Sequence, residues 1–161
     1  MPESAIPPDP KQSSLRTPHV DLPFEKYVLP NGLEVILHEE HRTPVVAVNI
    51  WYHVGAKDEG PGRSGFAHLF EHVMFQGSRN VGEDKFFFYL ERAGASDRNG
   101  STNFDRTNYY ETVPMGELGL ALWLESDRMG YLLDHANEKT FHEQREVVKN
   151  ERRQRIENAP Y

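Results

Sequence analysis

The chain contains no cysteine among its 161 residues. This absence excludes disulfide bonds, zinc sites built on thiolates, and cysteine nucleophiles in a single step. It does not by itself identify the cellular compartment. The sequence also lacks a glycine-rich phosphate loop of the kind that binds nucleotides.

Basic residues are the second shortage, with 18 Lys and Arg against 25 Asp and Glu, for a formal net charge of −7. This surplus of negative charge argues against nucleic acid or a membrane surface as the main partner. Residues 1–22 are rich in Pro and Ser and lack the apolar stretch of a signal peptide or membrane anchor. We expect them to be a flexible lead-in. We expect the chain in the cytoplasm by default, or in the periplasm if the native start differs.

The pattern of apolar residues predicts an α+β fold with a mainly antiparallel sheet. Two short apolar runs joined by Asn31 and Gly32 indicate a β-hairpin, and alternation over residues 45–54 indicates a strand with one inner face. A further strand is expected over residues 107–113, and helices over residues 65–77, 83–93, 115–133 and 137–158. In the third helix the expected core positions are Leu118, Leu122, Trp123 and Met129.

Residues 65–77, GFAHLFEHVMFQG, form the most informative of these helices. At 100° per residue, His68, Glu71 and His72 project from one narrow stripe, and Ser64 is the expected N-cap. Two imidazoles beside a carboxylate are costly to bury on an apolar helix unless they share a function. The opposite side is expected to face the core and carries Phe66, Leu69, Phe70, Val73 and Met74.

The spacing H-x-x-E-H offers such a function, because histidines at i and i+4 can each present a ring nitrogen to one metal ion. The Glu directly before the second His can then reach a water molecule on that metal. The sequence therefore predicts that His68 and His72 bind zinc and that Glu71 is a general base. From the residues alone, the alternative is a pair of partly buried structural histidines with Glu71 as their hydrogen-bond partner.

The H-x-x-E-H helix is the signature of the inverzincins. At this point the chain resembles the pitrilysin-type zinc peptidases (family M16), and most of all their bacterial members. The resemblance implies an α/β roll with helices packed on the sheet, as in the half-domains of pitrilysin and of the mitochondrial processing peptidase. It also implies that residues 23–161 are the N-terminal part of the catalytic domain, incomplete at the C-terminus.

A catalytic zinc typically has three protein ligands, and we expect the third from a carboxylate on the last helix. The residues alone leave these candidates open: Glu138, Glu143, Glu146, Glu151 and Glu157. The resemblance selects Glu151, because it ends a V-x-x-E tetrad with 78 residues between it and His72. Without the resemblance, Glu151 is as well explained as an exposed carboxylate paired with Arg155. Two turns earlier, where the family often has another Glu, this chain has Gln144, an amide that can still orient a ligand.

Residues 95–105 are rich in small polar residues, which is typical of a solvated turn. The same stretch is similar to the family's N-A-x-T segment, an edge strand beside the zinc to which a peptide substrate adds as a further strand. Here the segment reads Asn99, Gly100, Ser101 and Thr102. The resemblance thus implies that Asn99 and Thr102 bind substrate.

Together these features predict a zinc-dependent endopeptidase with one Zn²⁺ per chain, acting on peptide or unfolded protein substrates. The resemblance also implies a second half-domain as a partner, because the family's enzymes contain two similar halves. The alternative is a catalytically incomplete fragment or subunit that binds zinc and needs that second half for activity. The S-ribosylhomocysteine lyases also carry an H-x-x-E-H helix, but they need a cysteine, which this chain lacks.

Overall fold

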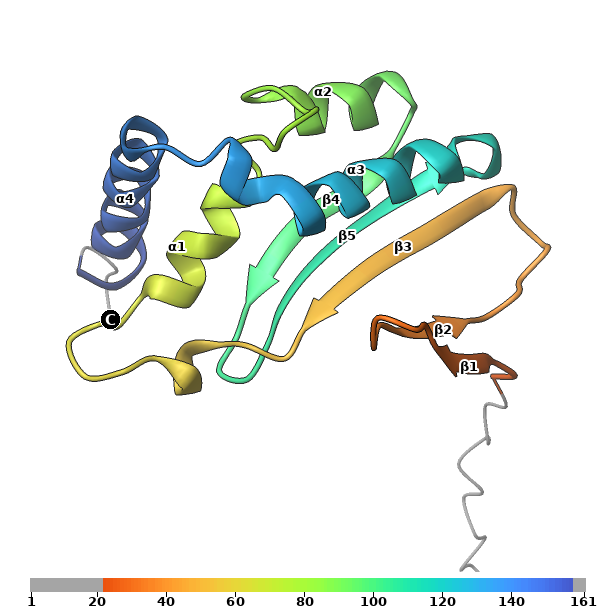
Figure 1. The fold of residues 1–161 in the computed structure, drawn as a ribbon, viewed down its shortest axis with the longest axis horizontal. Coiled ribbons are helices and arrows are strands. Elements are labelled where there is room, and N and C mark those ends of the chain that lie inside the picture. Colours follow the sequence, from red (N-terminus) through yellow and green to blue (C-terminus); the bar gives the residue numbers. More distant parts are fainter. Residues whose placement is uncertain (1–21, 158–161) are drawn as a thin grey trace, which may run out of the picture. The chain divides into compact units, whose positions relative to one another are not determined.

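The computed structural model describes residues 22–157 and forms two compact units, Met1–Thr43 and Pro44–Tyr161 (Figure 1). Of the predicted lead-in, residues 1–21 lie outside the described residues. No helix in the described part of the chain is long and apolar enough to cross a membrane.

The first unit contains the predicted β-hairpin. Strand β1 (Glu25–Val28) pairs antiparallel with β2 (Glu34–Leu37). The turn adopts the conformation that its residues favour, because Gly32 has a φ of 89° and Asn31 Oδ1 accepts a hydrogen bond from Leu33 N at 3.1 Å. The sequence prediction for this hairpin is confirmed.

The second unit is built on a three-stranded antiparallel sheet with the order β3-β5-β4. Its strands are β3 (Val45–Tyr52), β4 (Ser96–Thr102) and β5 (Thr107–Pro114). Strand β3 alternates as predicted, with Val46, Val48 and Ile50 more buried than their neighbours. Strand β4 lies at one edge of the sheet, in the stretch whose polar composition indicated a turn.

Four helices complete this unit and confirm the predicted α+β class. They are α1 (Phe66–Val73), α2 (Lys85–Arg92), α3 (Leu118–Tyr131) and α4 (Glu138–Arg152). Short turns flank them at η1 (Ala56–Asp58), η2 (Met115–Glu117), η3 (Leu132–Asp134) and η4 (Arg153–Glu157). Helices α1, α2 and α3 contact the sheet, and α4 packs against α1 (Figure 1). Helix α1 ends at Val73 and is shorter than the predicted range of 65–77.

The inner face of α3 differs from the predicted one. Leu122, Trp123 and Met129 were expected in the core, but their exposed fractions are 50%, 40% and 41%. Ala121 and Leu124 are fully buried instead. The prediction failed because charged residues also lie on the buried face of α3. The stripe of apolar residues in the sequence therefore does not coincide with the buried face. The core cluster contains Val48, Val81, Phe86, Leu90, Val113, Ala121 and Leu124.

Arg128 is the most unusual member of that buried face, with 1% of its surface exposed. Its guanidinium lies 4.0 Å from the ring centroid of Tyr109, 4.2 Å from that of Phe86 and 5.0 Å from that of Phe75. It also donates a hydrogen bond to Glu125 one turn earlier on α3. Three aromatic faces and one carboxylate thus replace the water that this cation loses on folding.

Glu111 on β5 lies beside this cluster and is 2% exposed, as is Glu125. Burial, followed by the charge of Glu125, raises the pKa of Glu111 to about 8. The Arg128 guanidinium acts in the opposite direction on this pKa, but with a smaller effect. Glu111 is therefore protonated in the folded protein at neutral pH, and its proton mediates the contact with Glu125.

Candidate metal centre

Helix α1 begins at a carboxylate from the preceding loop. Glu59 accepts hydrogen bonds from Gly65 N and Ala67 N, both at 2.8 Å. The N-cap position is Gly65, with a φ of 94°, so the prediction of Ser64 as the N-cap is wrong. An anion at this position satisfies two free backbone N–H groups and interacts favourably with the helix dipole. No sequence pattern predicts this role for Glu59, because it lies in a loop six residues before the N-cap position.

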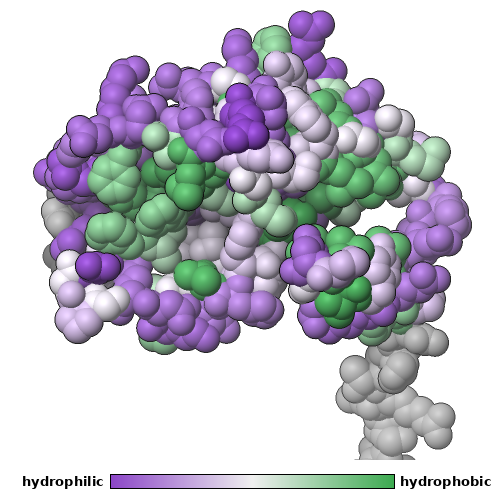
Figure 2. Space-filling view, in the orientation of Figure 1, coloured by the Kyte–Doolittle hydropathy of each residue, from purple (hydrophilic) through white to green (hydrophobic). Residues whose placement is uncertain are grey.

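The apolar side of α1 divides into a buried and an exposed half. Leu69 and Val73 are 5% and 7% exposed, as predicted. Phe66 and Phe70 were also expected in the core, but they are 42% and 48% exposed. In the space-filling view, apolar surface is visible on the side of the molecule where Figure 1 places α1 (Figure 2).

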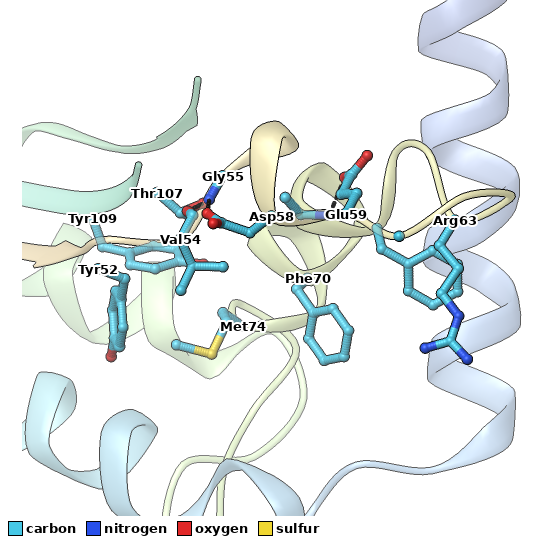
Figure 3. A pocket seen from close by; sticks show the side chains of 13 residues that line it. Tyr52, Val54, Gly55, Asp58, Glu59, Arg63, Phe70, Met74, Thr107 and Tyr109 are labelled. Atoms are coloured by element: carbon cyan, nitrogen blue, oxygen red, sulfur yellow. Dashed lines mark hydrogen bonds between the residues drawn. The ribbon is translucent and has the colours of Figure 1, made fainter. Parts of the chain in front are cut away.

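The exposed phenylalanines line a pocket of about 420 Å³ that also receives Met74 from the end of α1 (Figure 3). Tyr52, Val54 and other residues form the rest of its wall. None of the H-x-x-E-H residues lines it. The stripe of His68, Glu71 and His72 and this apolar pocket therefore use different sides of α1.

His68, His72 and Glu151 come together between α1 and α4. The two Nε2 atoms lie 3.1 Å apart. Glu151 Oε2 lies 3.6 Å from His68 Nε2, and Glu151 Oε1 lies 3.6 Å from His72 Nε2. Helix α4 carries Glu151 into this position, and its start is fixed by Asn137, whose Oδ1 accepts a hydrogen bond from Thr140 N at 3.0 Å.

The spacing of these three donors fits a zinc ion. Tetrahedral ligation at about 2.0–2.1 Å from the metal places neighbouring donor atoms about 3.3 Å apart. The two imidazole nitrogens lie 3.1 Å apart and each lies 3.6 Å from a different oxygen of Glu151, so these nearest separations fall on either side of that value. With one donor atom taken from each residue, all three lie within 4.8 Å of one another. The three side chains are partly buried, with exposed fractions of 36% for His68, 20% for His72 and 26% for Glu151. Such a donor set can hold a metal and still leave one side of it open.

Glu71 lies on the same stripe but points to the sheet. Thr102 on β4 donates a hydrogen bond from Oγ1 to Glu71 Oε2. A Cβ atom at Gly100 would lie 3.1 Å from Glu71 Cγ, so the absence of a side chain there lets Glu71 approach β4 closely. The structure thus separates Glu71 from the three donors and gives it a different hydrogen-bond partner.

Two other predicted residues lie near the centre without joining it. Asn99 on β4 is exposed, and its Oδ1 accepts a hydrogen bond from Gly100 N at 2.9 Å. Gln144 is half-buried on α4, and its side chain makes no hydrogen bond within residues 22–157. Arg155, which lies after α4, pairs with Glu151 Oε2 at 3.7 Å. Glu151 therefore contacts both its predicted surface partner and the two histidines.

Known proteins resemble this chain over most of its length. The family described as Insulinase (Peptidase family M16) matches residues 34–160. Zinc protease PqqE of Helicobacter pylori is 36% identical over 137 residues, which make up 84% of this chain and 30% of that protein. Human insulin-degrading enzyme is 31% identical over 96 residues, which make up 58% of this chain and 9% of that enzyme.

Solved structures share the fold. The crystal structure of a protease from Helicobacter pylori matches with a TM-score of 0.81 and 35% identity, covering 86% of this chain and 33% of that one. The periplasmic protease PqqL from Escherichia coli matches with a TM-score of 0.73 and 23% identity, covering 97% of this chain and 16% of that one. The chain thus spans a third or less of the length of these relatives. Because the family match extends from residue 34 to residue 160, this chain belongs to the insulinase family, peptidase family M16.

Proposed function

We propose that this chain is the metal-binding part of a zinc-dependent endopeptidase, in which His68, His72 and Glu151 hold one Zn²⁺ and Glu71 is the general base. The observation that carries the proposal is the convergence of His68, His72 and Glu151 from two helices, since one donor atom from each residue lies within 4.8 Å of the other two. Relatives that bear the name zinc protease support the choice of metal and of reaction.

A zinc ion at this place would supply Lewis acidity, which lowers the pKa of a water molecule and polarises the carbonyl group of a peptide bond. The two histidines and Glu151 orient the site by fixing three donors on α1 and α4. Glu71 receives the proton of the attacking water and passes it to the leaving amine. Its position next to His72, outside the set of three donors, leaves its carboxylate available for this task.

The edge strand β4 is the proposed substrate site. It lies at the edge of the sheet, where an extended peptide can add as a further strand, and such strand addition depends on N–H and C=O groups more than on side chains. Asn99 and Thr102 lie on this strand. Since the Thr102 hydroxyl donates to Glu71, we assign substrate contact at this position to the backbone of Thr102.

The active enzyme needs a second half-domain in this proposal. The chain matches the first half of the periplasmic protease PqqL with a TM-score of 0.75 at 24% identity, which concerns the fold alone. It spans 30% of the Helicobacter pylori zinc protease. Water exclusion and substrate clamping, which a second half would provide, cannot come from one half-domain. The chain alone is thus a zinc-binding but catalytically incomplete unit.

A quenched fluorescent peptide tests this function. We expect little or no hydrolysis by the chain alone, and zinc-dependent hydrolysis when the remaining part of the Helicobacter pylori zinc protease, C-terminal to the segment that this chain matches, is added. A chelator and the Glu71→Gln variant should each abolish the activity of the mixture. Full activity of Glu71→Gln would contradict the role of the base, and robust chelator-sensitive hydrolysis by the chain alone would contradict the need for a second half.

A further inference from the structure

Glu71 stands at the end of a row of two threonine hydroxyls. Thr102 Oγ1 donates a hydrogen bond to Glu71 Oε2 and lies 3.3 Å from Thr107 Oγ1. Thr107 Oγ1 in turn donates to the carbonyl oxygen of Val54 at 3.0 Å. The row therefore runs from the carboxylate on α1 through two strands of the sheet to the backbone just after β3. Figure 3 shows its far end, where Thr107 lies beside Val54.

The sheet fixes the positions of both hydroxyls. Thr102 and Thr107 are directly opposite each other at the end of the β4–β5 ladder. Thr107 is 7% exposed, and Thr102 and Glu71 are half-buried. Both threonines are β-branched, so few rotamers are open to them. In this arrangement Thr102 presents its proton to Glu71, and Thr107 presents its proton to the carbonyl oxygen of Val54.

The other side of the Glu71 side chain is also confined. A Cβ atom at Gly100 would lie 3.0 Å from Phe75 Cε2, 3.1 Å from Glu71 Cγ and 3.2 Å from Tyr109 Cδ1. The methylene groups of Glu71 are thus packed against β4, while its carboxylate is held by Thr102. Packing and hydrogen bonding together restrict Glu71 to the few rotamers in which its carboxylate keeps its hydrogen bond.

The hydrogen-bond capacities of the three groups agree with this arrangement. Each threonine hydroxyl has one proton to donate and two lone pairs to accept with. Thr107 uses its proton for Val54 O, and Thr102 uses its proton for the carboxylate. An ionised Glu71 only accepts hydrogen bonds, so Thr102 is its donor, and the two threonine hydroxyls are in contact at 3.3 Å with no proton left to share between them.

We propose that Thr102 is a positioning residue for Glu71 and that its hydroxyl orients the Glu71 carboxylate. The catalytic meaning of this contact rests on the proposed function, in which Glu71 is the general base. It gives the Thr102 side chain a task different from the substrate contact expected from the family resemblance. A small displacement of a catalytic group can lower turnover by about 100-fold.

A double-mutant cycle on the metal-free chain tests the contact independently of catalysis. Thr102→Val keeps the shape and the strand preference of threonine and removes the hydroxyl, whereas Thr102→Ser keeps the hydroxyl. With a chelator present, we expect Thr102→Val to raise the unfolding equilibrium constant about tenfold in the wild-type background, and to have no such effect in a Glu71→Ala background. Thr112→Val, on β5 with no side-chain hydrogen bond within residues 22–157, is the matched control and should change little. An equal effect of Thr102→Val in both backgrounds would overturn the proposal.

The second readout is turnover by the chain mixed with the second half-domain. We expect Thr102→Val to keep the zinc content and KM of the wild type and to lower kcat by about 10- to 100-fold, and Thr102→Ser to restore kcat. If kcat is unchanged in Thr102→Val although the cycle shows coupling, Thr102 does not position the base. If the wild-type mixture hydrolyses no peptide, the proposed function fails, and the metal-free cycle still decides whether the contact exists.

Discussion

Glu111 makes the stability of the second unit depend on pH in an unusual direction. Burial and the neighbouring Glu125 raise the pKa of Glu111 to about 8 in the folded protein. In the unfolded chain the pKa of a Glu side chain is about 4.3. Between these two values the folded state binds a proton that the unfolded state has released. The contribution of Glu111 to the free energy of unfolding is therefore fully present below the pKa that Glu111 has in the unfolded chain. This contribution falls as the pH rises toward 8.

The size of the effect follows from the pKa difference. One proton taken up on folding changes the free energy of unfolding by about 1.4 kcal/mol per pH unit. Over the range from pH 5 to pH 8 the loss is at most about 4 kcal/mol. The charge of Glu125 beside Glu111 broadens the titration of Glu111, so we expect a loss of about 2–4 kcal/mol.

The Glu111→Gln variant isolates this contribution, because its amide stays neutral at every pH. Urea unfolding with a chelator present, at intervals from pH 5 to pH 8.5, should show the wild type losing about 2–4 kcal/mol relative to the variant as the pH rises. Glu91→Gln, at a carboxylate that is 74% exposed on α2, is the matched control and should run parallel to the wild type. A constant difference between wild type and Glu111→Gln at every pH would refute the assigned burial of a protonated Glu111.

Two further predictions concern the surroundings of α1. Glu59→Ala should lower the free energy of unfolding by about 1 kcal/mol in urea and weaken zinc binding, because Gly65 N and Ala67 N lose their acceptor; full stability of this variant would contradict the capping role. Gly100→Ala should cost about 1 kcal/mol in thermal unfolding, because its new methyl group meets neighbours at 3.0–3.2 Å. Its control, Gly119→Ala, introduces a methyl into open space on α3 and should be stabilising; equal effects of both changes would show that the site near Gly100 is not crowded.

The elements with a strong local signal were predicted well from the sequence. The hairpin at Asn31 and Gly32 depends on neighbouring residues alone, and so does the alternating strand β3. The stop of α2 at Gly94 follows from the same kind of signal, since this residue has a φ of 76°. Where the pattern is local, sequence reasoning was therefore sufficient.

The predictions that failed depend on residues distant in the sequence. Arg128 is buried because Phe75, Phe86 and Tyr109 surround it, and no feature of α3 alone reveals those rings. Strand β4 lies at the sheet edge, as the family resemblance implied, but its polar composition alone indicated a turn. Glu59 caps α1 from a loop, and the periodicity of apolar residues does not predict the course of a loop.

The candidate site was predicted in part from spacing and in part from resemblance. The i, i+4 spacing sufficed to bring His68 and His72 to one side of α1. Glu151 could not be chosen from among the carboxylates of α4 by position alone, and only the family pattern selected it. The contact between Thr102 and Glu71 had no signal in the sequence, because it joins an edge strand to a helix 31 residues away.

The most direct test of the account is the zinc affinity of the purified chain, measured by competition with a chromogenic chelator. We predict one tightly bound zinc for the wild type and for Glu71→Gln, and an affinity more than about 100-fold weaker for Glu151→Gln. Glu143→Gln removes a 51% exposed carboxylate from the same helix and should leave the affinity unchanged. Unchanged zinc binding by Glu151→Gln, or equal losses in Glu71→Gln and Glu151→Gln, would contradict the assignment of His68, His72 and Glu151 as the metal ligands.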